Sequence, residues 1–207
     1  MAKNYAEIAF TESVKEKQEK YGSRKQYERM AAMARGTELS FGEVDFIQDR
    51  DSFYLATVGE NGYPYVQFRG GLKGFLKILD SKTLAYADFR GNLQYISVGN
   101  LSRNDKASLI LMDYVKKQRL KIYAQIEIKD ARNVPELIEE LEDKSYKAQI
   151  ERAMILHIEA FDWNCPQHIT QRFTLDEVEE KLKPYAKEIA RLQVELESLK
   201  KNLTKGD

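Results

Sequence analysis

Short apolar, β-rich stretches dominate the middle of the chain, with alternation at 63–69 and in the second half of 119–128. They cover residues 52–58, 63–69, 75–79, 83–87, 106–113, 119–128 and 152–163. Alternation with a period of two places successive side chains on opposite faces of a strand. Residues 59–62 read Gly-Glu-Asn-Gly, a strong hairpin signal because glycine and asparagine tolerate positive φ. The pattern therefore predicts six or seven antiparallel strands joined by hairpins, as in a barrel rather than a βαβ fold.

Helical signals flank these strands. A charged segment ends at Gly22, which suits the position just after a helix. Ser23 with Gln26, and Ser40 with Glu43, have the spacing of a capping box, in which a side chain at each position caps the other's backbone. The predicted helices span residues 11–21, 23–35, 40 onwards and 134–145. We expect them to cover the barrel.

The last part of the chain has a different period. Thr174 and Glu177 form another capping box, and the apolar residues then follow at alternating spacings of three and four: Leu175, Val178, Leu182, Tyr185, Ile189, Leu192, Leu196, Leu199 and Leu203. This is the seam of a coiled coil. Pro184 is predicted to bend or restart the helix. A second subunit is the preferred partner for the seam, and folding back onto the chain's own barrel is the alternative.

Length and composition divide the chain and limit its partners. We expect a helical segment at 1–50, a barrel at 51–173 and a coiled-coil helix at 174–207 of the 207 residues. Lys+Arg and Asp+Glu both number 33, which does not call for a nucleic acid or a membrane surface as partner. The single cysteine, with no apolar leader and no long apolar run, favours a cytoplasmic protein.

The first candidate site lies on the strand at 63–69. Tyr65, Gln67 and Arg69 share one face of that strand, which would suit a wall that faces a ligand. Gly70 and Gly71 then remove side chains where a ligand could approach the backbone. An arginine presents a planar fork of donors to an anionic or carbonyl-rich group. The alternative is an ordinary surface arginine before a turn.

The second candidate site follows the next hairpin. Asn92 is a good N-cap for a helix predicted at 92–101, and the amides at a helix start suit a phosphate. The residues that could bind there are Arg90, Gly91, Asn92, Gln94, Tyr95 and Ser97. An ordinary capped helix without a ligand is the alternative.

Several of these segments together resemble a known family. The run PYVQFRGG, GFLKILD, TLAYADFRGN and YISVGNLSRNDKASLILMD is similar to the pyridoxamine 5′-phosphate oxidase-like family of FMN-binding split barrels. The sequence FDWNCPQH at 161–168 resembles one subgroup of that family. The resemblance covers about residues 10–173, and no single motif decides it.

The resemblance implies a mainly β protein, a six-stranded antiparallel split barrel with flanking helices, that forms a homodimer with FMN at each subunit interface. Gln67, Arg69 and the 91–97 stretch would contact the flavin or its phosphate, and Lys77 or Lys73 would supply a further cation. Trp163 and Gln167 would reach the flavin of the partner subunit.

One departure from the family limits the expected reaction. The oxidase itself ends in a strand with an Arg-x-His-type substrate motif, whereas Arg172 here is followed by Phe173 and Thr174. We therefore expect an FMN-dependent oxidoreductase that acts on an unknown small molecule, with a nicotinamide as a possible electron donor. The sequence identifies no catalytic side chain, and its histidines and lone Cys165 do not form a metal site. The alternatives are a non-catalytic dimer that binds flavin or haem for storage or sensing, and a purely structural protein.

Overall fold

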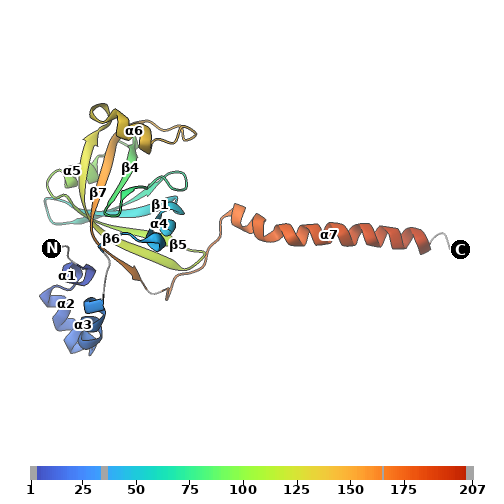
Figure 1. The fold of residues 1–207 in the computed structure, drawn as a ribbon, viewed down its shortest axis with the longest axis horizontal. Helices are drawn as coiled ribbons and strands as arrows, with labels where there is room; N and C mark the ends of the chain where they lie inside the picture. The colour runs from blue at the N-terminus through green and yellow to red at the C-terminus, as the bar shows by residue number, and fades with distance from the viewer. Residues whose placement is uncertain (1–3, 34–36, 165, 204–207) are drawn as a thin grey trace.

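One open, antiparallel sheet of seven strands forms the centre of the protein (Figure 1). The computed structural model describes residues 4–33, 37–164 and 166–203. The strands are β1 (Ser52–Val58), β2 (Pro64–Gly70), β3 (Lys77–Asp80), β4 (Thr83–Phe89), β5 (Lys106–Asp113), β6 (Gln118–Asp130) and β7 (Ile150–Asn164), in the order β2-β1-β5-β6-β7-β4-β3. The shape is consistent with a split barrel. The expected count of six strands is wrong, because the short β3 pairs with β4 as a seventh.

Alternation along the strands builds the main core, as predicted. In β5 every second residue is buried, and Leu109 and Leu111 are at most 1% exposed. Leu55 on β1 and Leu120 on β6 meet them from the neighbouring strands. The buried face of the sheet is therefore continuous across β1, β5 and β6. Burial of each such side chain contributes roughly 1.5–3 kcal/mol.

Strand β7 carries two extra residues, one opposite β6 and one opposite β4. Tyr123 pairs with Ala160 while Ala124 pairs with Ile158, so Glu159 has no partner on β6. A second shift lies between β4 and β7, where Asp88 pairs with Arg152 and Phe89 with Ile150. Such β-bulges bend a strand and change the direction of its side chains.

Helices precede, interrupt and follow the strands in the described part of the chain. They are α1 (Tyr5–Ala9), α2 (Glu12–Lys20), α3 (Arg24–Met33), α4 (Phe41–Gln48), α5 (Ile96–Leu101), α6 (Pro135–Leu141) and α7 (Leu175–Leu203), with a 3-10 turn at Ala131–Asn133. The predicted stop at Gly22 is confirmed by its φ of 76°. The predicted end of the next helix, at Arg35 and Gly36, lies outside the described residues. Figure 1 shows α1, α2 and α3 gathered at one side of the sheet.

The capping box at Ser40 and Glu43 is confirmed and starts α4. This helix buries Phe46 and Ile47 in the main core. Glu43 is itself buried and accepts a hydrogen bond of 2.6 Å from Nε1 of Trp163, whose indole packs edge-on against Phe46. Trp163 therefore holds α4 against the end of β7.

The C-terminal helix α7 extends away from the sheet (Figure 1). Its predicted cap is confirmed, because Thr174 and Glu177 form reciprocal hydrogen bonds. The helix continues through Pro184, so the predicted restart there is wrong. Among the described residues, no helix has the length and apolar character needed to cross a lipid bilayer.

The contact between Glu43 and Trp163 makes the stability of the protein depend on pH. Burial alone would raise the pKa of the Glu43 carboxyl, but hydrogen bonds from Ser40 and Trp163 outweigh it and hold the pKa below its ordinary value of 4.5. A lowered folded-state pKa stabilises the protein fully above the unfolded value, and this stabilisation is lost as pH falls through the folded pKa.

We therefore expect Glu43→Gln to lower the free energy of unfolding most at neutral pH. The difference from the wild type should shrink below about pH 4.5. Urea denaturation across this pH range measures it, with Asp45→Asn on the exposed side of the same helix as the control. A difference that does not change with pH would contradict the role of the Glu43 charge.

Candidate functional site

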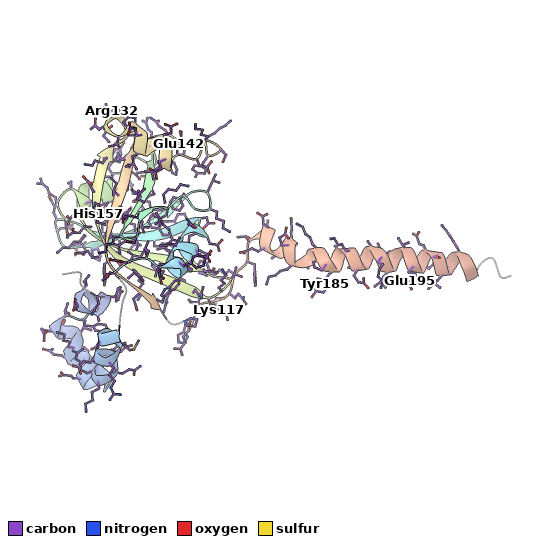
Figure 2. The ribbon with its side chains drawn as sticks, viewed as in Figure 1. Lys117, Arg132, Glu142, His157, Tyr185 and Glu195 are labelled. Carbon is purple, nitrogen blue, oxygen red and sulfur yellow. The ribbon has the colours of Figure 1, made fainter. Side chains whose placement is uncertain are left out.

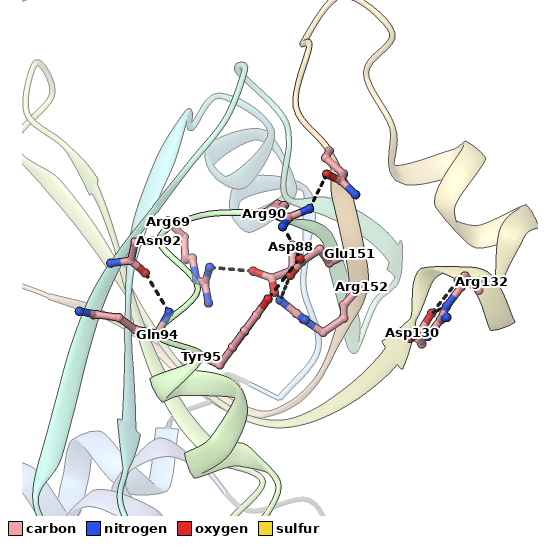
Figure 3. Close-up of polar contacts among 11 residues, drawn as sticks. Arg69, Asp88, Arg90, Asn92, Gln94, Tyr95, Asp130, Arg132, Glu151 and Arg152 are labelled. Atoms are coloured by element: carbon pink, nitrogen blue, oxygen red, sulfur yellow. Dashed lines mark hydrogen bonds and ion pairs between the residues drawn. The ribbon is translucent and has the colours of Figure 1, made fainter.

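An ion pair joins two distant strands of the open sheet at one end of the barrel. Nη1 of Arg69, on the edge strand β2, lies 2.7 Å from Oδ1 of Asp88 on β4 (Figure 3). Nε of Arg152, on β7, lies 2.8 Å from Oδ2 of the same carboxylate. Asp88 is only 2% exposed, and the two arginine side chains are 15% and 17% exposed. The buried carboxylate of Asp88 therefore binds two arginines, one from the edge strand β2 and one from β7, the neighbour of β4.

The bulge in β7 adds a second carboxylate to this cluster. Glu151 is the extra residue opposite Asp88 and Phe89, and its Oε2 accepts a hydrogen bond of 2.7 Å from Arg152. Its Oε1 lies 3.4 Å from the hydroxyl of Tyr95 and 3.9 Å from Nε of Arg90. Regular strand geometry would place two consecutive side chains on opposite faces. The bulge instead brings Glu151 and Arg152 into the same cluster.

The charges of this cluster do not cancel. Its described members are the three cations Arg69, Arg90 and Arg152 and the two anions Asp88 and Glu151, which leaves one positive charge. Burial alone would lower the pKa of Arg152, but Asp88 and then Glu151 outweigh it and raise that pKa. The arginines thus stay charged, and the site favours an anionic ligand.

The loop that follows β4 differs from the prediction. The helix does not start at Asn92: α5 covers only Ile96–Leu101, and Tyr95 is its N-cap. Asn92 instead accepts a hydrogen bond from the amide of Gln94 in a local turn, because an asparagine side chain readily competes for nearby backbone groups. The predicted helix start at Asn92 is therefore wrong, and phosphate binding by the 91–97 stretch stays a prediction.

Backbone strain marks this loop. Leu93 and Tyr95 have φ values of 63° and 52°, in the left-handed region that bulky side chains rarely adopt. Strain of this kind costs about 1–3 kcal/mol per residue and is common at binding sites. The hydroxyl of Ser97 anchors the end of the loop, because it donates a hydrogen bond of 2.8 Å to Oε1 of Gln67 on β2.

These groups line an open pocket of about 390 Å³. The side facing β2 contributes Tyr65, Gln67 and Arg69, which confirms that these three residues share a face. The other lining residues are Asp88, Phe89, Gly91, Asn92, Leu93, Gln94, Tyr95, Ile96, Ser97, Val98 and Arg152. The volume of about 390 Å³ includes open solvent, and the enclosed part of the pocket is about 40 Å³. Drug-sized ligands occupy pockets of roughly 300–1,000 Å³, so this pocket does not by itself enclose such a ligand and lies open on one side.

A second pocket of about 540 Å³ borders the first and shares Arg69, Asp88, Phe89 and Gly91 with it. The phenol of Tyr86 is fully buried at this pocket, and its hydroxyl has no hydrogen-bond partner among the described residues. Nε of Arg69 is likewise buried without a partner there. Burial raises the pKa of Tyr86 far enough to keep its hydroxyl protonated. Buried donors without partners are costly, and a ligand with acceptor atoms would relieve that cost.

The structure brings together many of the predicted site residues and leaves others apart. Gln67, Arg69, Gly91, Asn92, Gln94, Tyr95 and Ser97 line the first pocket, and Gly70 and Arg90 line the second. Lys77 lines a separate cavity near α6. Trp163 contacts α4, and Gln167 is exposed in a turn beyond β7. Cys165 lies outside the described residues. The binding roles of all these residues stay predictions.

The two glycines at the end of β2 have a local explanation. A Cβ atom on Gly70 would lie 2.8 Å from the ring of Phe68, and one on Gly71 would lie 2.8 Å from Phe75. The chain's own aromatic rings therefore fill the space that the sequence analysis assigned to a ligand. These glycines are needed for packing.

Three residues of the cluster were missed by the sequence analysis: Asp88, Glu151 and Arg152. The predicted strand ended at residue 87, one residue short of Asp88, which still belongs to β4 and has a buried side chain. Arg152 was read only as the first residue of an apolar strand. A charged residue at an inward position of two neighbouring strands is the signal that could have identified this pair.

Comparison with known proteins identifies the family. Residues 42–163 match the sequence model of pyridoxamine 5′-phosphate oxidase, which is more than half of the chain. The chain belongs to the pyridoxamine 5′-phosphate oxidase family. The resemblance expected from the sequence is thereby confirmed. No curated protein sequence matches the chain significantly.

Solved structures with similar folds come from several bacterial proteins. A candidate pyridoxamine 5′-phosphate oxidase from Lactobacillus delbrueckii is 22% identical, with 62% of this chain and 96% of that chain covered at a TM-score of 0.48. An FMN-binding protein from Syntrophomonas wolfei is 14% identical, with 71% and 97% covered at a TM-score of 0.44. An F420 reductase is 15% identical, with 60% and 98% covered at 0.44. Because these TM-scores are below 0.5, family membership rests on the sequence match.

The shared carboxylate of Asp88 should be essential for stability. Asp88→Asn leaves the buried charges of Arg69 and Arg152 without that counter-charge, and loss of one partner from a buried ion pair costs about 3–5 kcal/mol. We expect this loss in urea denaturation at neutral pH. The matched control is Asp130→Asn, because Asp130 pairs with Arg132 in a solvent-exposed contact (Figure 3) and its loss should change stability little. Equal effects of the two variants would contradict the importance of burial at Asp88.

Proposed function

We propose that the protein is a homodimeric flavoprotein that binds FMN in the pocket between β2, β4 and the 90–97 loop, and that it is an oxidoreductase acting on a small molecule. Membership of the pyridoxamine 5′-phosphate oxidase family supports a flavin site. The observation that carries the proposal is the convergence of Arg69, Arg90 and Arg152 on two adjoining open pockets, with Arg69 lining both.

The residues present fit FMN in charge and in hydrogen bonding. The cluster carries one excess positive charge, which suits a phosphate, and arginine forks bind phosphate oxygens with paired hydrogen bonds. The two buried donors without partners, Nε of Arg69 and the hydroxyl of Tyr86, suit the carbonyl and ring-nitrogen acceptors of a flavin. Phe68, Phe75 and Tyr146 add apolar rings along the second pocket.

When bound, FMN supplies hydride and electron transfer, and the protein's part is to bind and orient it. Arg69 and Arg152 hold charge at the pocket floor while Asp88 fixes their direction. Gln67, oriented by the hydroxyl of Ser97, presents its amide beside Arg69. Burial raises the pKa of Tyr86, so its phenol stays neutral and can donate a hydrogen bond. None of these steps requires a nucleophile or a general base.

A second copy of the chain would pack on the outer face of β1 and β2. On β1 and β2 the side chains opposite the pocket form an exposed apolar face, comprising Tyr54, Val58, Val66 and Phe68 at 38–61% exposure. Edge strands with exposed apolar side chains are sites of association. Because β2 carries Gln67 and Arg69 on its other face, a copy packed here would lie next to the cofactor.

The first test is the visible absorption of the purified protein before and after addition of FMN. We expect flavin bands, and Arg69→Ala should weaken FMN binding about 10- to 100-fold, because a charge-assisted hydrogen bond contributes roughly 1.5–3 kcal/mol. Arg90→Ala keeps the buried pair with Asp88 and is the second variant. Arg103→Ala, on an exposed arginine paired with Glu60, is the control. Unchanged affinity in both site variants would remove the pocket from consideration.

If FMN binds, oxidation of NADH or NADPH in the presence of an electron acceptor distinguishes the oxidoreductase from the non-catalytic alternative. Haem is the other cofactor that the sequence analysis left open. The described residues that line the pocket include no histidine, cysteine or methionine, and Tyr65 and Tyr95 are its candidate haem ligands. Family membership favours a flavin over haem.

The dimer is tested by Val66→Asp, which places a charge on the exposed apolar face of β2. We expect it to shift the mass measured by light scattering from dimer toward monomer, or to weaken FMN binding if the tails still hold the subunits together. Met30→Asp, at a residue of similar exposure on α3, is the control. A stable dimer with unchanged FMN affinity in the Val66 variant would show that this face is not the interface.

A further inference from the structure

The long helix α7 carries an apolar stripe that the rest of the described chain does not cover. The seam residues range from 38% exposed at Val178 to 81% exposed at Leu175. Figure 2 shows the side chains of α7, including Tyr185 and Glu195, in open space away from the sheet. A helix of 29 residues with such a stripe needs a partner for its apolar face.

The stripe has the geometry of a coiled-coil seam over the whole helix. In heptad notation Leu175, Leu182, Ile189 and Leu196 occupy a positions, and Val178, Tyr185, Leu192 and Leu199 occupy d positions. Pro184 then falls at c, on the outward side of the helix. Its ring therefore does not interrupt the seam. The seam residues occupy four successive heptads without a break.

The residues beside the seam favour one arrangement. At the g and e positions, which face each other between parallel helices, the pairs are Lys181 with Ala186, Glu188 with Gln193, and Glu195 with Lys200. Glu195 and Lys200 have opposite charges, and the two-fold symmetry of the dimer forms this pair twice. None of the three pairs places like charges together. We propose that α7 pairs in parallel and in register with α7 of a second copy of this chain.

An antiparallel pair of the same helices is less well matched. In an antiparallel pair the a and d residues of the two helices meet when Leu175 lies beside Leu199 of the partner subunit. The g positions of one helix then face the g positions of the other. Lys181 still meets Glu195, but Glu188 meets its own copy across the symmetry axis. Like charges that face each other are destabilising. Glu195 also contacts Arg191 of its own helix at 3.2 Å, and a second copy of the chain adds the pair with Lys200 of the partner subunit.

This inference does not depend on flavin binding. The tail could pair whether or not the pocket binds FMN, and the sheet could dimerise whether or not the tails pair. A failure of the tail experiment therefore leaves the proposed function untouched.

Single cysteines along the full-length chain test the pairing and its direction. The background is Cys165→Ser, which removes the only natural cysteine. Leu182→Cys and Leu199→Cys place a thiol at an a and a d position, and Val194→Cys places one at f on the outward face. Each variant is oxidised under mild conditions and covalent dimer is measured on a non-reducing gel. Circular dichroism verifies that each variant keeps its helix.

In a parallel, in-register pair each seam residue lies beside its own copy. We therefore expect Leu182→Cys and Leu199→Cys to cross-link at least about 10-fold faster than Val194→Cys, because pairing raises the effective thiol concentration. A double variant with Leu175→Cys and Leu199→Cys that cross-links while both seam single variants fail would indicate antiparallel pairing and overturn the proposal. Seam variants that cross-link no faster than Val194→Cys would overturn it as well.

Discussion

The ion pair between Arg69 and Asp88 closes the fold at the point where the sheet itself is open. Backbone hydrogen bonds connect neighbouring strands from β2 round to β3, but they do not connect the two ends of that series. Near the site, the carboxylate of β4 and the guanidinium of β2 make the link. Its strength depends on burial, because a charge pair in contact with water contributes little. The same burial explains why a second cation, Arg152, is held at the same carboxylate.

This arrangement connects stability with binding. The arginines of the cluster already have anionic partners, so an incoming anion would compete with Asp88 and Glu151 for their donors. The donors without partners on Arg69 and Tyr86 are the places where a ligand gains contacts without such competition. The internal counter-charges of the arginines, Asp88 and Glu151, hold these cations in place at the pocket. A site made of unpaired arginines would repel itself.

Much of the fold could be predicted from the sequence, because strands with one buried face leave a two-residue period and helix starts leave capping pairs. Ser40 with Glu43, and Thr174 with Glu177, are local signals of this kind. The shared face of Tyr65, Gln67 and Arg69 was likewise local. Asp88, Glu151 and Arg152 were not predictable in this way, since their roles depend on which strands become neighbours. The prediction that Asn92 caps a helix was wrong for a related reason, because an asparagine side chain caps a turn as readily as a helix.

The bulge at Glu151 has a consequence for how this site can vary between related chains. Side chains on a strand alternate, so the number of residues between two points decides which face a side chain occupies. Deletion of one residue there would restore regular pairing and would turn either Glu151 or Arg152 away from the pocket. Substitutions elsewhere in β7 leave that count intact. The site is thus more sensitive to the length of β7 than to the identity of most of its residues. Related chains that lack the extra residue would keep the sheet but would not place both Glu151 and Arg152 at the pocket.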